Sequence, residues 1–127
     1  AQPLVLVVDD IPSFREIVRD MLADLGFTNI DEAADGSEAF HKLKHRSYAL
    51  VISDHMMSPT TGLELLEAMR ADPTLKGVPF IMVSAVSDAE VVERAKEVGL
   101  NDYLVKPVAF AAFRRCVLEV LVPFMEP

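Results

Sequence analysis

The sequence predicts an α/β fold in which five parallel strands alternate with five helices. Short apolar runs at residues 4–8, 49–54, 80–83 and 103–105 suit strands that are buried on both faces. A half-polar run at 28–33 suits a strand at the sheet edge. The segments between these runs carry apolar residues at helical spacing. Because such crossovers are right-handed, we expect a parallel sheet covered by helices on both faces, a three-layer sandwich.

The first helix is predicted directly after the first strand. Pro12 suits a first helical turn, whereas Ser13 and Glu16 have the spacing of a capping box and would start the helix one residue later. Gly26 is a typical signal for the end of a helix. The apolar residues in between form one helical stripe: Phe14, Ile17, Val18, Met21, Leu22 and Leu25.

Capping-box spacing also marks the starts of the next three helices. The pairs are Asp35 with Glu38, Thr61 with Glu64, and Ser87 with Glu90. Asp72-Pro73 and Gly99 are expected to end the third and fourth helices. The last helix has its apolar stripe over residues 110–124, and Pro123 is expected to disturb it.

Composition limits the classes of function. The chain of 127 residues is long enough for one domain with a core, and its single cysteine, Cys116, excludes an internal disulfide. A net charge of −8 argues against direct binding of nucleic acid or of an anionic membrane surface. The apolar runs are too short to span a bilayer and no secretory leader opens the chain. We therefore expect a soluble, cytoplasmic protein.

Polar residues follow four of the predicted strands at their carboxyl ends. Asp9 and Asp10 follow the first strand, Asp54 ends the central one, and Ser84 and Lys106 follow the last two. The carboxyl ends of parallel strands meet at one edge of the sheet, where open α/β sheets bind their ligands. We therefore expect three carboxylates, a hydroxyl and an ammonium group to converge there.

The chemistry of this set indicates phosphoryl transfer at a metal site. Three neighbouring carboxylates are costly unless a cation lies between them, and a set of oxygen ligands suits a hard cation such as Mg²⁺. The cation, Lys106 and Ser84 could together hold the oxygens of a phosphoryl group. A carboxylate can attack phosphorus to form an acyl phosphate, and Asp54 is the expected nucleophile because it ends the central run.

Five segments resemble the motifs of response-regulator receiver domains. They are Leu6-Val-Val-Asp-Asp10, Val51-Ile-Ser-Asp54, Gly62-Leu-Glu-Leu-Leu66, Met82-Val-Ser-Ala85 and Tyr103-Leu-Val-Lys-Pro107. Each motif alone is weak, but five in this order and spacing are specific. The resemblance covers nearly the whole chain and is greatest to the single-domain chemotaxis regulators of this family. It implies a flavodoxin-like sheet of strand order 2-1-3-4-5 and one receiver domain over residues 1–127.

The resemblance also implies a metal site and a phosphoacceptor. Asp54 matches the phosphoacceptor of the family. Asp10 and Asp54 match direct Mg²⁺ ligands, Asp9 matches a residue that acts through water, and Met56 matches one that coordinates through its backbone carbonyl. The loop at 55–61 departs from the family pattern, because its proline lies one place later and a threonine replaces the usual aspartate before Gly62. We therefore expect an altered loop geometry around an unchanged site.

A switch and its partners follow from the same resemblance. Ser84 matches the switch hydroxyl, Lys106 the phosphoryl-binding lysine and Tyr103 the switch aromatic. The implied phosphoryl donor is a phosphohistidine on a sensor kinase or phosphotransfer protein. The implied target is a protein that docks on the fourth helix, the fifth strand and the fifth helix. Such a domain catalyses its own phosphorylation and dephosphorylation and is otherwise not an enzyme.

Two other functions compete with this one. A Mg²⁺-dependent phosphatase could use an aspartyl phosphate, but that class has its nucleophile at the end of the first strand and its second aspartate two residues further on, whereas Asp9 and Asp10 are adjacent. A degenerate receiver could bind partners without phosphorylation, although the set of acceptor, hydroxyl and lysine is complete. His55, beside the acceptor, is expected to point to solvent.

Overall fold

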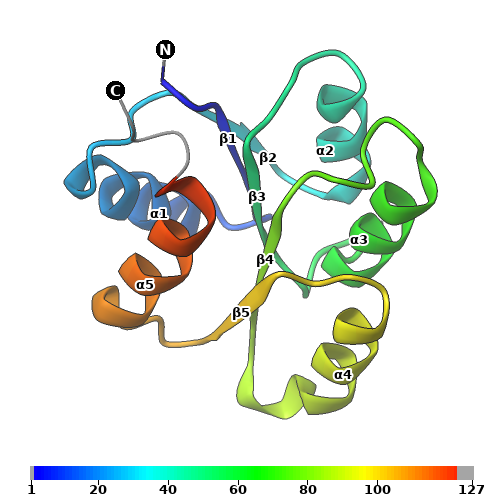
Figure 1. Ribbon diagram of the computed structural model, residues 1–127. Helices are drawn as coiled ribbons and strands as arrows, with labels where there is room; N and C mark the ends of the chain where they lie inside the picture. Colours follow the sequence, from blue (N-terminus) through cyan, green and yellow to red (C-terminus); the bar gives the residue numbers. More distant parts are fainter. Residues whose placement is uncertain (1, 123–127) are drawn as a thin grey trace.

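The computed structural model describes residues 2–122 and contains one five-stranded parallel sheet of order β2-β1-β3-β4-β5, as the family resemblance implied (Figure 1). Its strands are β1 (Val5–Val8), β2 (Ile30–Ala33), β3 (Leu50–Asp54), β4 (Phe80–Ser84) and β5 (Asp102–Val105). In the register of the sheet, Val8 lies beside Ser53, and Asp54 lies beside Val83. The residues that follow β1, β3, β4 and β5 therefore meet at one edge.

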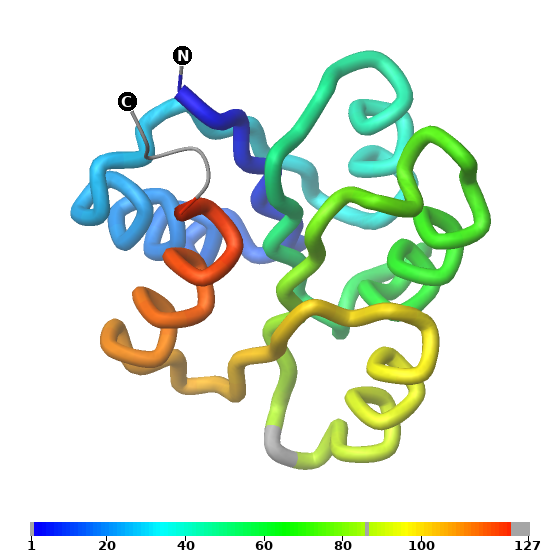
Figure 2. The backbone as a smooth tube through the Cα atoms, viewed as in Figure 1, coloured from blue at the N-terminus to red at the C-terminus, as the bar shows by residue number. Residues whose placement is uncertain are grey.

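Helices cover both faces of this sheet in three layers, as predicted. The helices are α1 (Pro12–Asp24), α2 (Gly36–Leu43), α3 (Gly62–Ala71), α4 (Ala89–Glu97) and α5 (Phe110–Leu121). One face carries α1 and α5, which lie at opposite ends of the chain, and the other face carries α2, α3 and α4 (Figures 1 and 2). Within residues 2–122, no helix has the length and apolar character needed to cross a membrane. The predicted disturbance at Pro123 lies outside the described residues.

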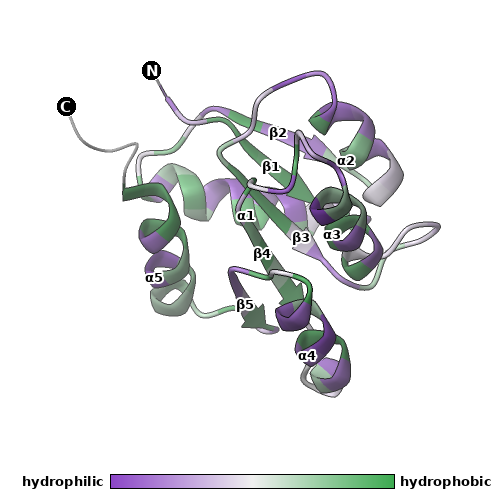
Figure 3. Cartoon of the chain, turned by 45° about the vertical axis from the view of Figure 1, so that its right-hand side comes forward, coloured by the Kyte–Doolittle hydropathy of each residue, from purple (hydrophilic) through white to green (hydrophobic). Residues whose placement is uncertain are grey.

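Alternation along the strands produces two hydrophobic cores, one on each face of the sheet. Val5 and Val7 of β1 face α1 and α5, where Val18, Leu22, Phe113, Val117 and Leu121 are buried. Leu6 and Val8 face the other three helices, where Ala39, Leu43, Leu65, Leu66, Met69 and Ala95 are buried. Figure 3 shows apolar strands in the centre and helices whose polar sides face outwards. The two cores hold the central strands rigidly, so the polar residues at the strand ends have fixed positions.

Two of the four predicted capping boxes differ in the structure. The first helix begins at Pro12 with Ile11 as N-cap and no side-chain cap bond, so the box at Ser13 is wrong; the rigid proline sets the start. The box at Ser87 is also wrong, because a 3₁₀ turn at Val86–Asp88 precedes α4. In that turn the Asp88 side chain accepts a hydrogen bond from the backbone N–H of Ala85 at 3.0 Å.

The other two capping predictions are confirmed in whole or in part. Thr61 and Glu64 form the complete capping box of α3. At α2, Asp35 accepts from the backbone N–H of Glu38 at 3.0 Å as predicted, but the Glu38 carboxylate accepts from Ala34 instead of Asp35. The helix stop predicted at Gly26 is confirmed: its φ of 93° lies in the left-handed region that favours glycine.

Candidate functional site

The three predicted carboxylates converge at the carboxyl edge of the sheet. Asp9, Asp10 and Asp54 each place an oxygen within 4.8 Å of the others. Asp9 and Asp54 are buried, whereas Asp10 is exposed. They meet because β1 and β3 are adjacent parallel strands in matching register. The result is an acidic cluster of Asp9, Asp10 and Asp54, in which Asp10 is the exposed member.

Lys106 lies across this group from the direction of β5. Its Nζ atom is 3.1 Å from Oδ1 of Asp54 and 3.8 Å from Oδ2 of Asp9. Its backbone N–H donates to the carbonyl oxygen of Ser84 at 2.8 Å, which fixes the lysine beside the end of β4. The ring of Phe14 on α1 lies 4.5 Å from Nζ, a distance suited to a cation–π contact. Lys106 is thus held between a carboxylate pair and an aromatic face.

Two polar atoms at this edge are buried without a hydrogen-bond partner among residues 2–122. They are Oγ of Ser84 and Oδ2 of Asp9. Buried polar atoms in native proteins nearly always have partners, because leaving one unpaired costs about 1–3 kcal/mol. Two such atoms at the same edge as a buried carboxylate paired with a half-buried lysine indicate a site built for a ligand.

Burial also perturbs the carboxylates. It raises the pKa of Asp9 from 3.8 to about 6, and the nearby Asp54 adds to this effect. Burial likewise raises the pKa of Asp54, while the contact with Lys106 opposes the rise. In addition, Lys106 supplies one ammonium group for three neighbouring carboxylates. A further cation would be favoured here.

The donor set fits the predicted Mg²⁺. Its described side-chain donors are carboxylate oxygens, which a hard divalent cation prefers. The unpartnered Oδ2 of Asp9 and the exposed carboxylate of Asp10 provide free lone pairs. Coordination by the carbonyl of Met56 stays a prediction; the residue as a whole is 63% exposed.

The altered loop after Asp54 is anchored by close backbone contacts. The N–H groups of Met57 and Gly62 both donate to the carbonyl oxygen of His55 at 2.9 Å. A Cβ atom on Gly62 would lie 2.3 Å from the carbonyl oxygen of Asp54, so only glycine fits there. Thr60 accepts from Gly36 at 3.3 Å, which ties the loop to the start of α2.

The prediction that His55 points to solvent is wrong. His55 is 8% exposed, and its Nδ1 atom accepts a hydrogen bond from the backbone N–H of Leu63 at 3.3 Å. The imidazole therefore stabilises the first turn of α3, next to the glycine that contacts Asp54. Its role in the structure is to hold the loop that surrounds the predicted acceptor.

Tyr103, the predicted switch residue, lies beside a hollow that reaches Ser84. The hollow has a volume of about 200 Å³, and its lining includes Ala89 and Val92 of α4 and Val105 of β5. Tyr103 is 36% exposed, and Nζ of Lys96 lies 5.3 Å from the centroid of its ring. The ring thus has both apolar area left to bury and a space beside it.

Two side chains that contact the site were missed in the sequence: Phe14, whose ring lies against Lys106, and Arg15, which donates to the carbonyl oxygen of Asp9. Phe14 was assigned only to the apolar stripe of the first helix, and Arg15 was not singled out. Both lie in the first turns of α1, four to six residues after the carboxylate pair. A side chain in the first turns of a helix that directly follows a strand can reach back to the end of that strand. This position in the sequence is the signal that could have identified both residues.

Comparison with known proteins gives a consistent family assignment. Residues 5–117 match the family described as the response regulator receiver domain. The chain is 41% identical over 103 residues to the chemotaxis protein CheY of Pseudomonas aeruginosa, covering 81% of this chain and 83% of the relative. Its fold matches a crystal structure of a response regulator receiver protein from Pseudomonas putida with a TM-score of 0.86 at 32% identity, covering 94% and 98% of the two chains.

A third similar structure is the receiver domain of a sensor histidine kinase from Pseudomonas aeruginosa. It has a TM-score of 0.85 at 26% identity, and the match covers 96% of this chain and 99% of that one. That structure is described as having a magnesium ion coordinated in its active-site cleft.

Proposed function

The chain belongs to the response regulator receiver domain family, and from this premise we propose that it is a phosphorylation-controlled switch that accepts a phosphoryl group on Asp54. Receivers of this family act as signalling switches in two-component systems. The observation that carries the proposal is a buried carboxylate 3.1 Å from a lysine, at the same edge as an unpartnered serine hydroxyl. We propose further that residues 1–127 form a single receiver domain.

Each residue has a role in the transfer. A carboxylate oxygen of Asp54 attacks the phosphorus of a phosphohistidine, an O–P bond forms, and the P–N bond breaks as the imidazole leaves with a proton. Lys106 stabilises the negative charge on the phosphoryl oxygens, and Ser84 donates its hydroxyl to one of them. Hydrolysis of the acyl phosphate reverses the modification, so the domain catalyses only reactions at its own aspartate.

The acidic cluster of Asp9, Asp10 and Asp54 is the proposed binding site for Mg²⁺. Asp10 and Asp54 would bind the ion directly, Asp9 through water, and Met56 through its backbone carbonyl. When bound, the ion supplies positive charge that offsets the repulsion between carboxylates and phosphoryl oxygens. The magnesium site of the similar kinase receiver domain supports this assignment.

The switch depends on the free hydroxyl of Ser84. Ser84 lines the hollow beside Tyr103, and its hydroxyl has no hydrogen-bond partner among the described residues. A phosphoryl oxygen on Asp54 would supply the missing acceptor, and movement of the hydroxyl toward Asp54 would enlarge the hollow. Entry of the ring into the hollow would bury apolar area worth about 1 kcal/mol. Such a difference shifts a two-state population several-fold. The face formed by α4, β5 and α5 would then change and bind a downstream protein.

The setting of the switch follows from the family. We infer that the donor is a sensor histidine kinase or a phosphotransfer protein, and that the domain works in the cytoplasm. The similarity to a chemotaxis protein makes chemotaxis the first pathway to test. We propose no direct contact with nucleic acid or membrane, because the net charge of the chain is −8.

The proposal is tested by intact mass spectrometry after incubation with acetyl phosphate, with and without Mg²⁺. Wild type should gain the mass of one phosphoryl group in the presence of Mg²⁺, and Asp54→Asn should gain none. Asp72→Asn, a carboxylate substitution at the other end of the sheet, is the matched control and should behave like wild type. An unchanged gain in Asp54→Asn would overturn the acceptor assignment.

The same experiment separates the competing functions. A phosphatase would release phosphate from many small phosphate esters over repeated turnovers, whereas a receiver turns over only its own acyl phosphate. A degenerate receiver would gain no mass under any of these conditions. The switch itself is tested by backbone amide NMR with beryllofluoride as phosphoryl mimic: shifts should extend to α4 and β5 in wild type and contract to the site in Ser84→Ala.

A further inference from the structure

We propose that Arg15 is a positioning residue that holds Asp9 and Asp10 in their cation-binding arrangement. The inference rests on the proposed function, since it assumes that these carboxylates take a divalent cation. Arg15 lies outside the acidic cluster and would not contact the ion. The inference is supported by the set of contacts that surrounds the backbone of Asp9.

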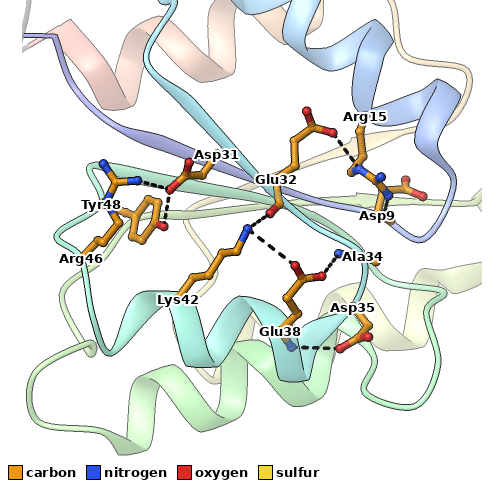
Figure 4. Close-up of polar contacts among 10 residues, drawn as sticks. All are labelled: Asp9, Arg15, Asp31, Glu32, Ala34, Asp35, Glu38, Lys42, Arg46 and Tyr48. Atoms are coloured by element: carbon orange, nitrogen blue, oxygen red, sulfur yellow. Dashed lines mark hydrogen bonds and ion pairs between the residues drawn. The ribbon is translucent and has the colours of Figure 1, made fainter.

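Arg15 connects Asp9 to the neighbouring edge strand (Figure 4). Its Nη1 atom donates to the carbonyl oxygen of Asp9 at 2.6 Å, and its Nε atom donates to Oε1 of Glu32 at 2.8 Å. The side chain is 17% exposed, so these bonds are largely shielded from water. The planar guanidinium can make both bonds at once with fixed geometry, which a lysine cannot.

Glu32 is itself fixed on both sides. Its second carboxylate oxygen lies 3.2 Å from Nη1 of Arg19 on α1. Its carbonyl oxygen accepts a hydrogen bond from Lys42 on α2, whose Nζ atom also lies 3.6 Å from the carboxylate of Glu38 (Figure 4). The anchor for Arg15 is therefore held mainly by β2 and by Lys42 of α2, because the pair with Arg19 is 43% exposed on the arginine side and contributes little.

The hydrogen bonds of Asp9 show what the arginine achieves. The N–H group donates to Ala33 at 3.1 Å, Oδ1 accepts from the N–H of Ile11 at 2.8 Å, and the carbonyl oxygen accepts from Arg15. Only Oδ2 is left without a hydrogen-bond partner among the described residues. With the other polar atoms held, Oδ2 lies 3.8 Å from Nζ of Lys106, on the side of the acidic cluster of Asp9, Asp10 and Asp54.

The carbonyl bond also controls the residue that follows. The carbonyl of Asp9 belongs to the peptide unit that begins Asp10, so its orientation sets the direction of the Asp10 backbone and side chain. Arg15 donates to the carbonyl oxygen of Asp9 and to Glu32, not to a carboxylate of the acidic cluster, so it acts on this peptide by position and occupies no ligand atom of the cation site. Outer contacts of this kind typically change metal affinity about 10-fold or more.

The test compares Mg²⁺ affinity, measured by calorimetry, in wild type, Arg15→Met and Arg19→Met. The second variant is a matched control, because Arg19 is on the same helix and pairs with the same glutamate but does not contact Asp9. Arg15→Met should bind Mg²⁺ about tenfold more weakly. Arg19→Met should stay within about twofold of wild type, as expected for an exposed ion pair.

Two further measurements separate positioning from a merely structural role. In the absence of metal, the amide NMR signals of Asp10 and Ile11 should move in Arg15→Met and stay in place in Arg19→Met. Arg15→Lys should recover part of the affinity, since an ammonium group can still donate to the carbonyl. If Arg15→Met does not fold, Glu32→Gln serves instead and should weaken Mg²⁺ binding to a smaller extent.

The outcomes are distinguishable. Equal Mg²⁺ affinity in wild type and folded Arg15→Met would overturn the inference and leave the proposed function intact. Equal weakening in both arginine variants would overturn it as well, because the contact to Asp9 would then be irrelevant. If wild type itself binds no Mg²⁺, the proposed function fails and this inference fails with it.

Discussion

Polar groups gather at both ends of the sheet, but they are hydrogen-bonded to different extents. At the carboxyl edge, Ser84 and Asp9 each keep a buried atom without a partner among the described residues, and burial raises the pKa of Asp9. At the opposite end, Asp72 accepts from Lys44 and Thr74, and hydrogen bonds with these groups lower its pKa to about 2. The hydroxyl of Tyr48 there donates to Asp31 at 2.7 Å.

This difference separates two uses of polar side chains. Groups that find partners within the chain, such as Asp72 and Tyr48, contribute to the stability of the fold. Groups that are held without partners lower stability and keep their bonding capacity for a ligand. The carboxyl edge therefore has the properties of a functional site, and the opposite end has those of a scaffold.

The largest difference in stability between the two ends of the sheet is expected when one glycine at each end is replaced by alanine. Gly62→Ala would place a Cβ atom 2.3 Å from the carbonyl oxygen of Asp54 and 2.9 Å from Cα of His55. The loop must shift, so the free energy of unfolding should fall by about 2–3 kcal/mol. Gly77→Ala meets no atom within 4 Å and should change it by less than about 1 kcal/mol. Urea denaturation measures both; equal losses would mean that the loop adapts freely.

The next effect is the pH dependence that Asp9 imposes. Its pKa is about 6 in the folded chain against 3.8 for an ordinary aspartate, so the folded state binds the proton more tightly. The contribution of Asp9 to stability is then greatest below about pH 4 and is lost as the pH rises through about 6, by on the order of 3 kcal/mol. Unfolding of wild type and Asp9→Asn in the presence of a chelator should show this difference. A pH-independent difference would contradict it.

Removing one hydroxyl group at each end of the sheet tests the same difference between a group with a partner and a group without one. Tyr48→Phe removes a hydroxyl that donates to a carboxylate, and should lower the free energy of unfolding by about 1–2 kcal/mol. Ser84→Ala removes a hydroxyl that has no partner among residues 2–122, and should leave the free energy within about 0.5 kcal/mol of wild type or raise it. If Ser84→Ala were the more damaging change, the hydroxyl would have a structural role.

The smallest effect is the acid sensitivity of Asp72. Because its pKa is lowered to about 2, the carboxylate stabilises the folded state above the ordinary value of 3.8, and this stabilisation is lost as the pH falls toward 2. The difference in thermal midpoint between wild type and Asp72→Asn should have its largest value near neutral pH and be clearly smaller at about pH 3. This is opposite in sign to the behaviour expected of Asp9. A difference that grows on acidification would show that the contacts of Asp72 do not favour its charged form.

Much of the site was accessible from the sequence because parallel topology constrains it. Once the apolar runs were assigned to strands of one sheet, the residues after them had to share an edge. Asp9, Asp54 and Lys106 therefore could be grouped without any knowledge of side-chain positions, and the structure brings them together. The strand order itself came from the family resemblance, since periodicity alone does not fix which strands are neighbours.

The errors concern contacts that local patterns do not encode. His55 is buried because its ring accepts from a backbone N–H eight residues further along, a partner that only the folded loop provides. Ser87 has capping-box spacing, but the neighbouring Asp88 satisfies the N–H of Ala85 and forms a different turn. Arg15 and Glu32 are 17 residues apart and meet only because α1 packs beside β2. Spacing within a segment predicts none of these contacts.

The assignment of Asp54 as the phosphoacceptor is tested most directly by locating the phosphoryl group among the three neighbouring carboxylates. Wild type is treated with acetyl phosphate and Mg²⁺, the acyl phosphate is reduced with borohydride to homoserine, and the peptides are identified by mass spectrometry. Homoserine is expected at Asp54, the carboxylate beside Lys106, and not at Asp9 or Asp10. Reduction at Asp9 or Asp10, or at an aspartate outside the site, would contradict the assignment.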